Sequence, residues 1–232
     1  MTSHDIYLLS PEISMAGLAI VLILLDLVIS RKGVLTIVAV VGLAIPLALS
    51  LILWSDLTDQ SVAQMDADFG TGFVTFVVDK FSLFFKFLLV GVTALVFLSS
   101  SEYVSKFKKF HGEFFALVLF SASGMMLMAS TVELISIYVA LELTALPIAA
   151  LTAFLRDSRS SEAGMKFLIL SAISSAVLLY GMVIIYGFTG TTVLADIATQ
   201  LRGLIDGDAA FGGNALLFGI VLVVAGFGFK IS

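Results

Sequence analysis

Long apolar runs alternate with short polar stretches along the whole chain, and seven of these runs approach the length of a membrane-spanning helix. A helix needs roughly 20 apolar residues to cross the hydrocarbon core of a bilayer. The run over 37–48 is apolar on every side, which argues against the alternating strands of a barrel. Because backbone groups in lipid must bond to one another, the pattern predicts an all-α integral membrane fold. The expected helices cover approximately 13–30, 34–54, 81–100, 113–130, 133–154, 164–188 and 215 onward.

Basic residues gather in alternate connections between the expected helices. One set of connections carries seven Lys and Arg, whereas the other set carries two among many acids. Positively charged loops stay in the cytoplasm or its equivalent, so we expect the N-terminus outside. The connection over 193–206 fits either a short amphipathic helix on the outer face or an ordered surface loop. The seven basic residues are Arg31, Lys32, Lys106, Lys108, Lys109, Arg156 and Arg159, and the two are Lys80 and Arg202.

Composition supports this assignment and narrows the chemistry. Apolar residues make up 60% of the 232 residues and charged residues only 12%, whereas a soluble domain carries about a quarter charged residues. The net charge of -5 argues against nucleic acid as a partner. With no cysteine and only two histidines, we expect neither a metal centre nor a bound cofactor in this chain.

Both ends of the chain carry information about processing. No Lys or Arg precedes the first apolar run, and no small-residue cleavage site follows it before Arg31, so we expect a retained helix and not a cleaved signal. The last apolar run reaches Ser232 without a polar stop. We therefore expect a fragment, or one piece of a split subunit.

Glu142 is the most informative ionisable residue, because it lies in the apolar stretch YVALELTALPIAAL. It is about nine residues inside its expected helix, which places it roughly 14 Å deep. Charges at that depth are costly and are usually functional or paired. Pro147 frees the carbonyl of Leu143 and leaves room for water or a polar side chain beside the carboxylate. The alternative is a structural glutamate between two packed helices.

Two lysines are candidates to exchange protons with Glu142. Lys230 lies in GFGFK, where Gly226 and Gly228 weaken the helix and permit a local break that would give the amine access to water. The alternative is an interfacial lysine at a helix end. Lys166 lies near the cytoplasmic start of its segment, and Glu162 precedes it by four residues, the favourable order for a helical ion pair. A snorkelling lysine with a local partner is therefore the alternative there.

The remaining intramembrane charges favour structural roles. Lys86 shares a helix face with Asp79, so we expect pairing or snorkelling. Glu133 opens its segment and is expected at the interface. His111 is expected at the surface, and Asp26 is expected to orient the cytoplasmic end of the first helix.

Three stretches of this chain resemble consecutive motifs of one family. They are LELTALPIAALTAF, SSEAGMKFLILSAISSAVLLYGMVIIYGFTGTT and GFGFKIS, and the opening LLSPEI is also similar. The resemblance is to the N-type antiporter-like membrane subunit of respiratory complex I (NADH–quinone oxidoreductase), over its N-terminal portion. It extends over nearly the whole chain and is most specific over 141–192.

The resemblance implies that residues 1–232 form a single membrane domain, the N-terminal half of a fourteen-helix subunit with two inverted five-helix repeats. It implies proton transport coupled to quinone reduction elsewhere in the complex, which uses NAD and quinone. It also implies other complex I membrane subunits as partners and a bacterial inner (plasma) membrane as the location. Glu142 matches the family's fifth-helix glutamate, Lys166 the sixth-helix lysine and Lys230 the lysine of the broken seventh helix.

Two other functions stay open from the residues. A subunit of a multisubunit cation/proton antiporter shares the glutamate–proline and lysine pattern, although SSEAGMKF favours the N-type subunit. A purely structural membrane subunit would tolerate Glu142→Gln, whereas a proton-conducting one would not.

Overall fold

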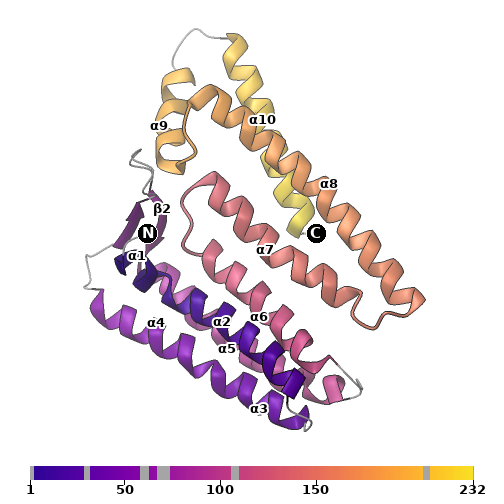
Figure 1. Cartoon of the computed structure of the whole chain (residues 1–232). Helices are drawn as coiled ribbons and strands as arrows, with labels where there is room; N and C mark the ends of the chain where they lie inside the picture. Colours follow the sequence, from indigo (N-terminus) through magenta and orange to yellow (C-terminus); the bar gives the residue numbers. More distant parts are fainter. Residues whose placement is uncertain are drawn as a thin grey trace.

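A computed structural model describes residues 3–28, 32–57, 63–66, 74–105, 110–205 and 210–231. Within these residues the chain forms ten helices and two short strands (Figure 1). Four of the basic residues used to orient the chain, Arg31, Lys106, Lys108 and Lys109, lie outside the described residues. The elements are α1 (Ser3–Leu8), α2 (Ser10–Val28), α3 (Lys32–Gly42), α4 (Ala44–Asp56), β1 (Ala63–Asp66), β2 (Val74–Val78), α5 (Lys80–Ser105), α6 (His111–Met128), α7 (Leu134–Thr152), α8 (Ser158–Thr189), α9 (Leu194–Ile205) and α10 (Ala210–Ile231).

Seven spans in the described residues are long and apolar enough to cross a membrane, which confirms the predicted all-α multi-pass membrane fold. One of them, Gly33–Asp56, consists of two helices, α3 and α4, that meet at Leu43. Pro46 explains the interruption, because it has no amide hydrogen and its ring clashes with the carbonyl four residues earlier. Proline is tolerated in the first turn of a new helix, where Pro46 lies.

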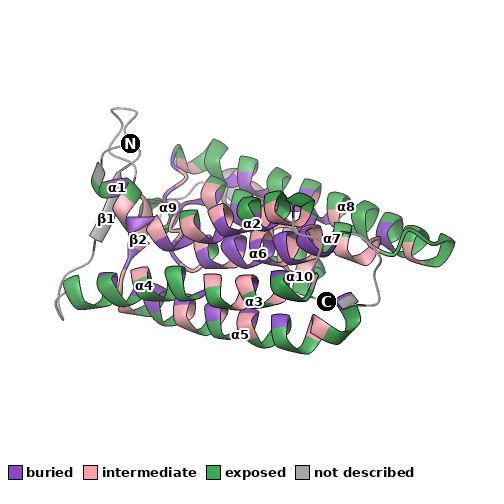
Figure 2. Cartoon of the chain, turned by 60° about the horizontal axis from the view of Figure 1, so that its bottom comes forward, coloured by how far each residue is buried: buried purple, intermediate pink, exposed green. Residues whose placement is uncertain are grey.

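Apolar side chains cover the outside of these spans as well as the inside. Figure 2 shows exposed residues along the outward faces of α3, α4, α5 and α8. Leu27 is 86% exposed and Val28 is 78% exposed. Soluble monomers rarely expose contiguous apolar surface on this scale. The chain is therefore an integral, multi-pass membrane protein whose outward faces suit lipid or neighbouring membrane helices.

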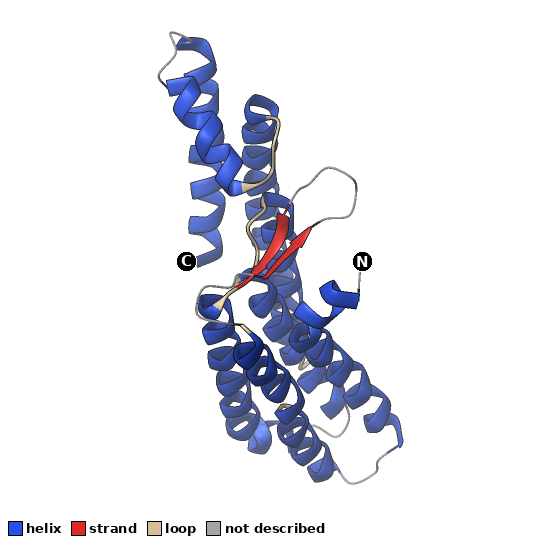
Figure 3. Ribbon diagram, turned by 90° about the vertical axis from the view of Figure 1, so that its left-hand side faces the viewer, coloured by secondary structure: helices blue, strands red, loops and turns tan. Residues whose placement is uncertain are grey.

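A small sheet, which the hydropathy pattern did not reveal, lies at one end of the bundle. β1 and β2 pair antiparallel, with Ala63 opposite Val78 (Figure 3). We call this end the strand end. The segment 130–134 adds to it: Val77 donates its amide to the Ser130 carbonyl, and Leu194 donates to the carbonyl of Val132. Backbone bonds thus join the α5 side of the bundle to the α8–α9 connection.

Apolar packing forms two large neighbouring helix groups and a smaller cluster where α1, α4 and the start of α5 meet beside β2. In the first, α2, α3, α5 and α6 bury a core that includes Leu22, Phe97 and Phe115. In the second, α7, α8, α9 and α10 pack around Leu178 and Met182. The contact of α6 with α7 joins the two groups.

The segment over 193–206 forms a helix, α9, so the amphipathic-helix alternative is confirmed over Leu194–Ile205. Ile197 is buried and packs with the second group, whereas Asp196 and Gln200 are exposed. This division between an apolar and a polar face is typical of a helix that lies on a surface.

Candidate functional site

The central feature of the second helix group is an ion pair between α7 and α10. Lys230 Nζ donates a hydrogen bond to Glu142 Oε1 at 2.7 Å. The lysine side chain is 9% exposed and the glutamate side chain is 23% exposed. Both residues lie within membrane-spanning segments. A charge at such a position needs a partner of opposite sign, and these two residues supply it to each other.

Ser175 of α8 completes the immediate surroundings of Glu142. Its hydroxyl is in close contact with Glu142 Oε1 and also lies 2.8 Å from the carbonyl oxygen of Ser171. One carboxylate oxygen therefore faces an ammonium group from α10 and a hydroxyl group from α8. Glu142 thus connects three helices through one polar cluster inside an otherwise apolar packing layer.

The position of α10 explains how Lys230 reaches Glu142. Counted at 1.5 Å per residue, Glu142 lies about 12 Å along α7 from Leu134, and Lys230 lies about 30 Å along α10 from Ala210. Figure 1 shows that α10 begins beyond the start of α7 and runs obliquely to α8, so that its end lies beside the middle of α8. The stagger and tilt of α10 therefore bring Lys230 level with Glu142, although the two residues lie at different distances from the starts of their helices.

The sequence suggested that Gly226 permits a local helix break, but α10 is helical through Ile231. Gly226 instead allows two helices to pack closely. A Cβ on Gly226 would lie 2.6 Å from the Cβ of Leu178 on α8. The Gly226 carbonyl also accepts a hydrogen bond from Ser174 at 2.9 Å. Close approach of α8 and α10 requires this glycine, and that approach positions Lys230 one turn later.

Lys166 lies apart from this cluster. Its amine pairs with Glu162 at 2.6 Å, and both side chains are largely exposed, at 70% and 64%. Ser175, which contacts Glu142, lies about 14 Å further along α8. The structure thus brings Glu142 and Lys230 together but leaves Lys166 with the local partner that the sequence spacing indicated.

A second buried ion pair lies in the first helix group. Lys86 of α5 is fully buried, and its Nζ lies 2.7 Å from Oε1 of Glu12 on α2, although the angles are not those of a hydrogen bond. Glu12 Oε2 is buried with no hydrogen-bond donor among the described residues. An ion pair of Lys86 was expected, but with Asp79 and not with Glu12. Asp79 instead accepts the amide of Ser82 at the start of α5.

Sequence reasoning missed this pair because it considered partners of Lys86 only within one helix. The signal that could have found it was Glu12, an acid at the start of the first apolar run, which needs a cation if it is buried. Which helices become neighbours cannot be read from hydropathy alone.

Two further ionisable residues at helix ends are buried. His111 is 5% exposed, so the expected surface position is wrong. It opens α6 where that helix approaches the end of α2: a Cβ on Gly112 would lie 2.5 Å from the Cβ of Asp26. Glu133 is 6% exposed and caps α7, its Oε2 accepting hydrogen bonds from the Ser136 amide and hydroxyl at 2.8 and 2.7 Å.

Glu133 lies just outside the span that begins at Leu134. Burial alone would raise the pKa of its carboxyl, but hydrogen bonds from Ser136, together with those from Thr192 and the Ile135 backbone, outweigh burial and lower the pKa below its ordinary value. The folded state therefore favours the charged form of Glu133. No group of three or more His, Asp or Glu side chains in the described part of the chain could hold a metal ion.

Comparisons with known proteins agree with the arrangement of these helices. Residues 131–232 match the family described as "NADH:quinone oxidoreductase/Mrp antiporter, TM". NADH-quinone oxidoreductase subunit N of Dehalococcoides mccartyi is 34% identical over 97% of this chain and 44% of its own length. The Desulfitobacterium hafniense subunit N is 38% identical over 100% of this chain and 44% of its own length. The chain therefore spans less than half the length of these relatives.

Solved structures show the same fold. Respiratory complex I from Thermus thermophilus contains a chain that is 30% identical, with a TM-score of 0.63 over 94% of this chain and 43% of that one. The Mrp complex from a Dietzia species contains a chain with a TM-score of 0.72 over 96% of this chain and 23% of that one. At 20% identity, the second likeness concerns the fold alone.

Proposed function

Because this chain belongs to the family of the N-type antiporter-like membrane subunit of NADH-quinone oxidoreductase, over the N-terminal portion of that subunit, we propose that it helps to move protons across the membrane. Quinone reduction elsewhere in the complex would drive this movement. NAD and quinone would be used by the whole complex, with no cofactor held by this chain. Residues 1–232 would form one membrane domain, to which the rest of a fourteen-helix subunit is added.

The observation that carries this proposal is the Glu142–Lys230 pair inside the membrane. A nearby carboxylate stabilises the charged form of a lysine, and desolvation opposes it. The proton on Lys230 is therefore held while Glu142 faces it as an anion. If Glu142 is neutralised or withdrawn, a buried lysine without a partner favours its neutral form and releases the proton.

Ser175 and Lys166 would have supporting roles in this mechanism. The Ser175 hydroxyl, in contact with Glu142, can take over one hydrogen bond to the carboxylate when the lysine withdraws. Lys166 would lie between the pair and the cytoplasm, as the first group to meet an entering proton. Its exposure and its pairing with Glu162 support a position at the water boundary.

The proposed setting follows from charge and family. Basic connections would face the cytoplasm and the N-terminus the outside of a bacterial inner membrane. Other membrane subunits of the complex would cover part of the exposed apolar surface, and lipid the rest. A cation/proton antiporter subunit is the second candidate, because the Mrp complex shares the fold.

The test replaces Glu142 by Gln, which keeps the shape of the side chain and removes its charge. We expect the rate of proton uptake coupled to quinone reduction to fall by roughly tenfold, the effect of about 1.4 kcal/mol on a barrier, while the complex still assembles. Proton uptake is measured in membrane vesicles with equal complex content. Asp196→Asn is the matched control, because Asp196 is exposed on α9 and has no part in the proposed proton path. Lys166→Gln should have a smaller effect than Glu142→Gln, because Lys166 is exposed and paired with Glu162.

Parental pumping by Glu142→Gln would refute the central role of this carboxylate. The antiporter alternative would be favoured by two results together. Vesicles with the parent protein would exchange sodium for protons without any quinone-reducing activity, and Glu142→Gln would lose that exchange.

A further inference from the structure

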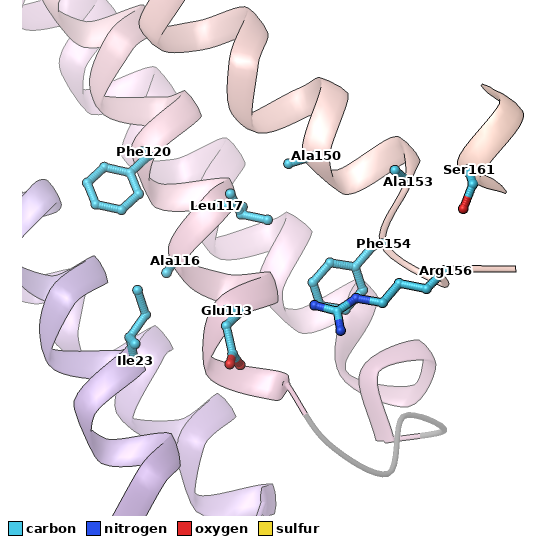
Figure 4. Close-up of a pocket in the computed structure, with 10 residues that line it drawn as sticks. All are labelled: Ile23, Glu113, Ala116, Leu117, Phe120, Ala150, Ala153, Phe154, Arg156 and Ser161. Carbon is cyan, nitrogen blue, oxygen red and sulfur yellow. The ribbon is translucent and has the colours of Figure 1, made fainter. Parts of the chain in front are cut away.

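A cavity of about 580 Å³ lies at the end of the molecule opposite the strand end. It is formed where α6 begins, where α7 ends and where α8 begins, with α2 on its far side (Figure 4). This volume is within the range of roughly 300–1,000 Å³ that is typical of small-molecule sites. Its lining residues are Ile23, Glu113, Ala116, Leu117, Phe120, Ala150, Ala153, Phe154, Arg156 and Ser161.

The inner part of the cavity is apolar. Three alanines on α6 and at the end of α7 leave the space that larger side chains would fill, and Leu117 and Phe120 form its deeper wall. From Glu113 to Phe120 the cavity follows α6 for about 10 Å. Because Glu113 is in the first turn of α6, this part extends into the apolar span. It therefore suits a hydrocarbon chain.

The outer part of the cavity carries one acid and one base. Glu113 Oε2 is buried with no hydrogen-bond partner among the described residues. The Arg156 guanidinium lies 4.7 Å from the Phe110 ring centroid, a cation–π contact. No ion pair joins Glu113 to Arg156 within the described part of the chain. Figure 4 shows the Arg156 side chain extending from the α7–α8 connection toward the helix that carries Glu113.

We propose that this cavity binds a zwitterionic phospholipid with a primary ammonium headgroup, of the phosphatidylethanolamine class. The ammonium would donate to the buried Glu113 oxygen that has no partner. The phosphate would accept from Arg156, whose planar guanidinium is suited to phosphate oxygens. One acyl chain would lie along Leu117 and Phe120.

Charge complementarity favours this ligand over other amphiphiles. An anionic lipid without an amine would pair with Arg156 but place a phosphate near the Glu113 carboxylate. An uncharged amphiphile would leave both groups without a counter-ion. The two charges also lie at the correct depth, since Arg156 follows the last turn of α7 and Glu113 lies in the first turn of α6. A headgroup at a membrane boundary occupies that level.

The site is distinct from the proposed proton-carrying pair. Ala150 and Ala153 lie about 12 and 16 Å beyond Glu142 along α7, toward the opposite end of the helix from the strands. The inference therefore does not depend on proton transport, and its test has a readout of its own.

The test uses the assembled complex in vesicles that contain equal amounts of phosphatidylethanolamine and phosphatidylglycerol. One lipid at a time carries a photoreactive group in its acyl chain, and mass spectrometry maps the crosslinks to residues 113–120 and 150–156. We expect labelling by phosphatidylethanolamine in the parent protein. Glu113→Gln should lower that labelling by about tenfold, the loss expected for one charge-assisted hydrogen bond, and should leave phosphatidylglycerol labelling unchanged.

Two further variants keep the test decisive. Ala150→Leu should fill the exposed side of the cavity and lower labelling by either lipid. Glu162→Gln, which removes the same negative charge from a nearby exposed position outside the cavity, should change nothing. Equal phosphatidylethanolamine labelling in the parent and in Glu113→Gln would overturn the proposal. So would preferential labelling by phosphatidylglycerol, or the absence of labelling because a neighbouring protein segment fills the cavity.

Discussion

Lys230 and Glu142 are 88 positions apart in the sequence, yet Nζ of one lies 2.7 Å from Oε1 of the other. The contact joins α10 to α7 beside the middle of α8, whose Ser175 contacts the same carboxylate oxygen. Breaking a buried ion pair by removing one partner costs on the order of 3–5 kcal/mol. The proposal that this pair also exchanges a proton can be tested by separating the charge of Lys230 from its ability to deprotonate.

Lys230→Arg makes that separation. Arginine keeps the positive charge and can bond to Glu142, but it cannot be deprotonated in proteins. We expect an assembled complex in which proton uptake coupled to quinone reduction falls by roughly tenfold. The measurement is vesicle acidification at equal complex content. Lys80→Arg is the matched control, because Lys80 opens α5 and has no part in the proposed proton path, so this variant should pump nearly at the parental level. Normal pumping by Lys230→Arg would show that this lysine serves only as a structural charge.

Glu133 predicts a pH dependence of stability at the strand end. Hydrogen bonds from Ser136 lower the pKa of Glu133 in the folded state, despite its burial. Its contribution is therefore fully present above the unfolded pKa of about 4.3 and is lost as the pH falls through the lower folded pKa. Glu133→Gln should reduce stability at neutral pH by about 1 kcal/mol, a usual value for a helix cap.

The check is thermal unfolding of the purified complex at several pH values. The parent protein should lose stability on acidification, and the difference between parent and Glu133→Gln should shrink in the same pH range. A difference that grows as the pH falls would contradict the assigned sign.

The spans of this fold could be predicted from the sequence because lipid requires long apolar helices, and each expected run does contain a helix. The break at Leu43 was not predicted, although Pro46 signalled it. The β1–β2 pair was missed because short strands in a polar connection leave no hydropathy signal. For the site, intramembrane depth identified Glu142 and Lys230 as candidates. Their direct contact depends on the stagger and tilt of α10, which no local pattern records.

Glu12 and Lys86 illustrate the same limit, and they provide the next prediction. Lys86 is fully buried, so Glu12→Gln would leave its ammonium without a counter-charge. We expect this variant to destabilise the first helix group by on the order of 3–5 kcal/mol. The measurement is the amount of subunit retained in the purified complex and its unfolding midpoint.

The double variant Glu12→Leu with Lys86→Met removes both charges and replaces them with apolar side chains of similar volume. It should recover most of the lost stability, because an apolar replacement of a buried pair is often nearly neutral. If the double variant recovers stability but pumps poorly, the pair takes part in proton transport. If each single variant is as stable as the parent, the burial of Lys86 among α2 and α5 is contradicted.

Gly226 and Gly228 allow the last prediction, because they are two residues apart on α10 and differ in what a Cβ would meet. At Gly226 a Cβ would lie 2.6 Å from the Leu178 Cβ and 2.8 Å from its Cα, whereas at Gly228 nothing lies within 4 Å. Gly226→Ala must therefore push α8 and α10 apart, at a cost of about 1–3 kcal/mol for overpacking. Since Lys230 is one turn further along the same helix, that movement should also lengthen its contact with Glu142. Gly228→Ala should instead be neutral or slightly stabilising, because alanine favours a helix more than glycine does. Unfolding midpoints and coupled proton uptake, measured side by side for the two variants, check both effects. Equal behaviour of the two variants would mean that close packing of α8 and α10 does not position Lys230.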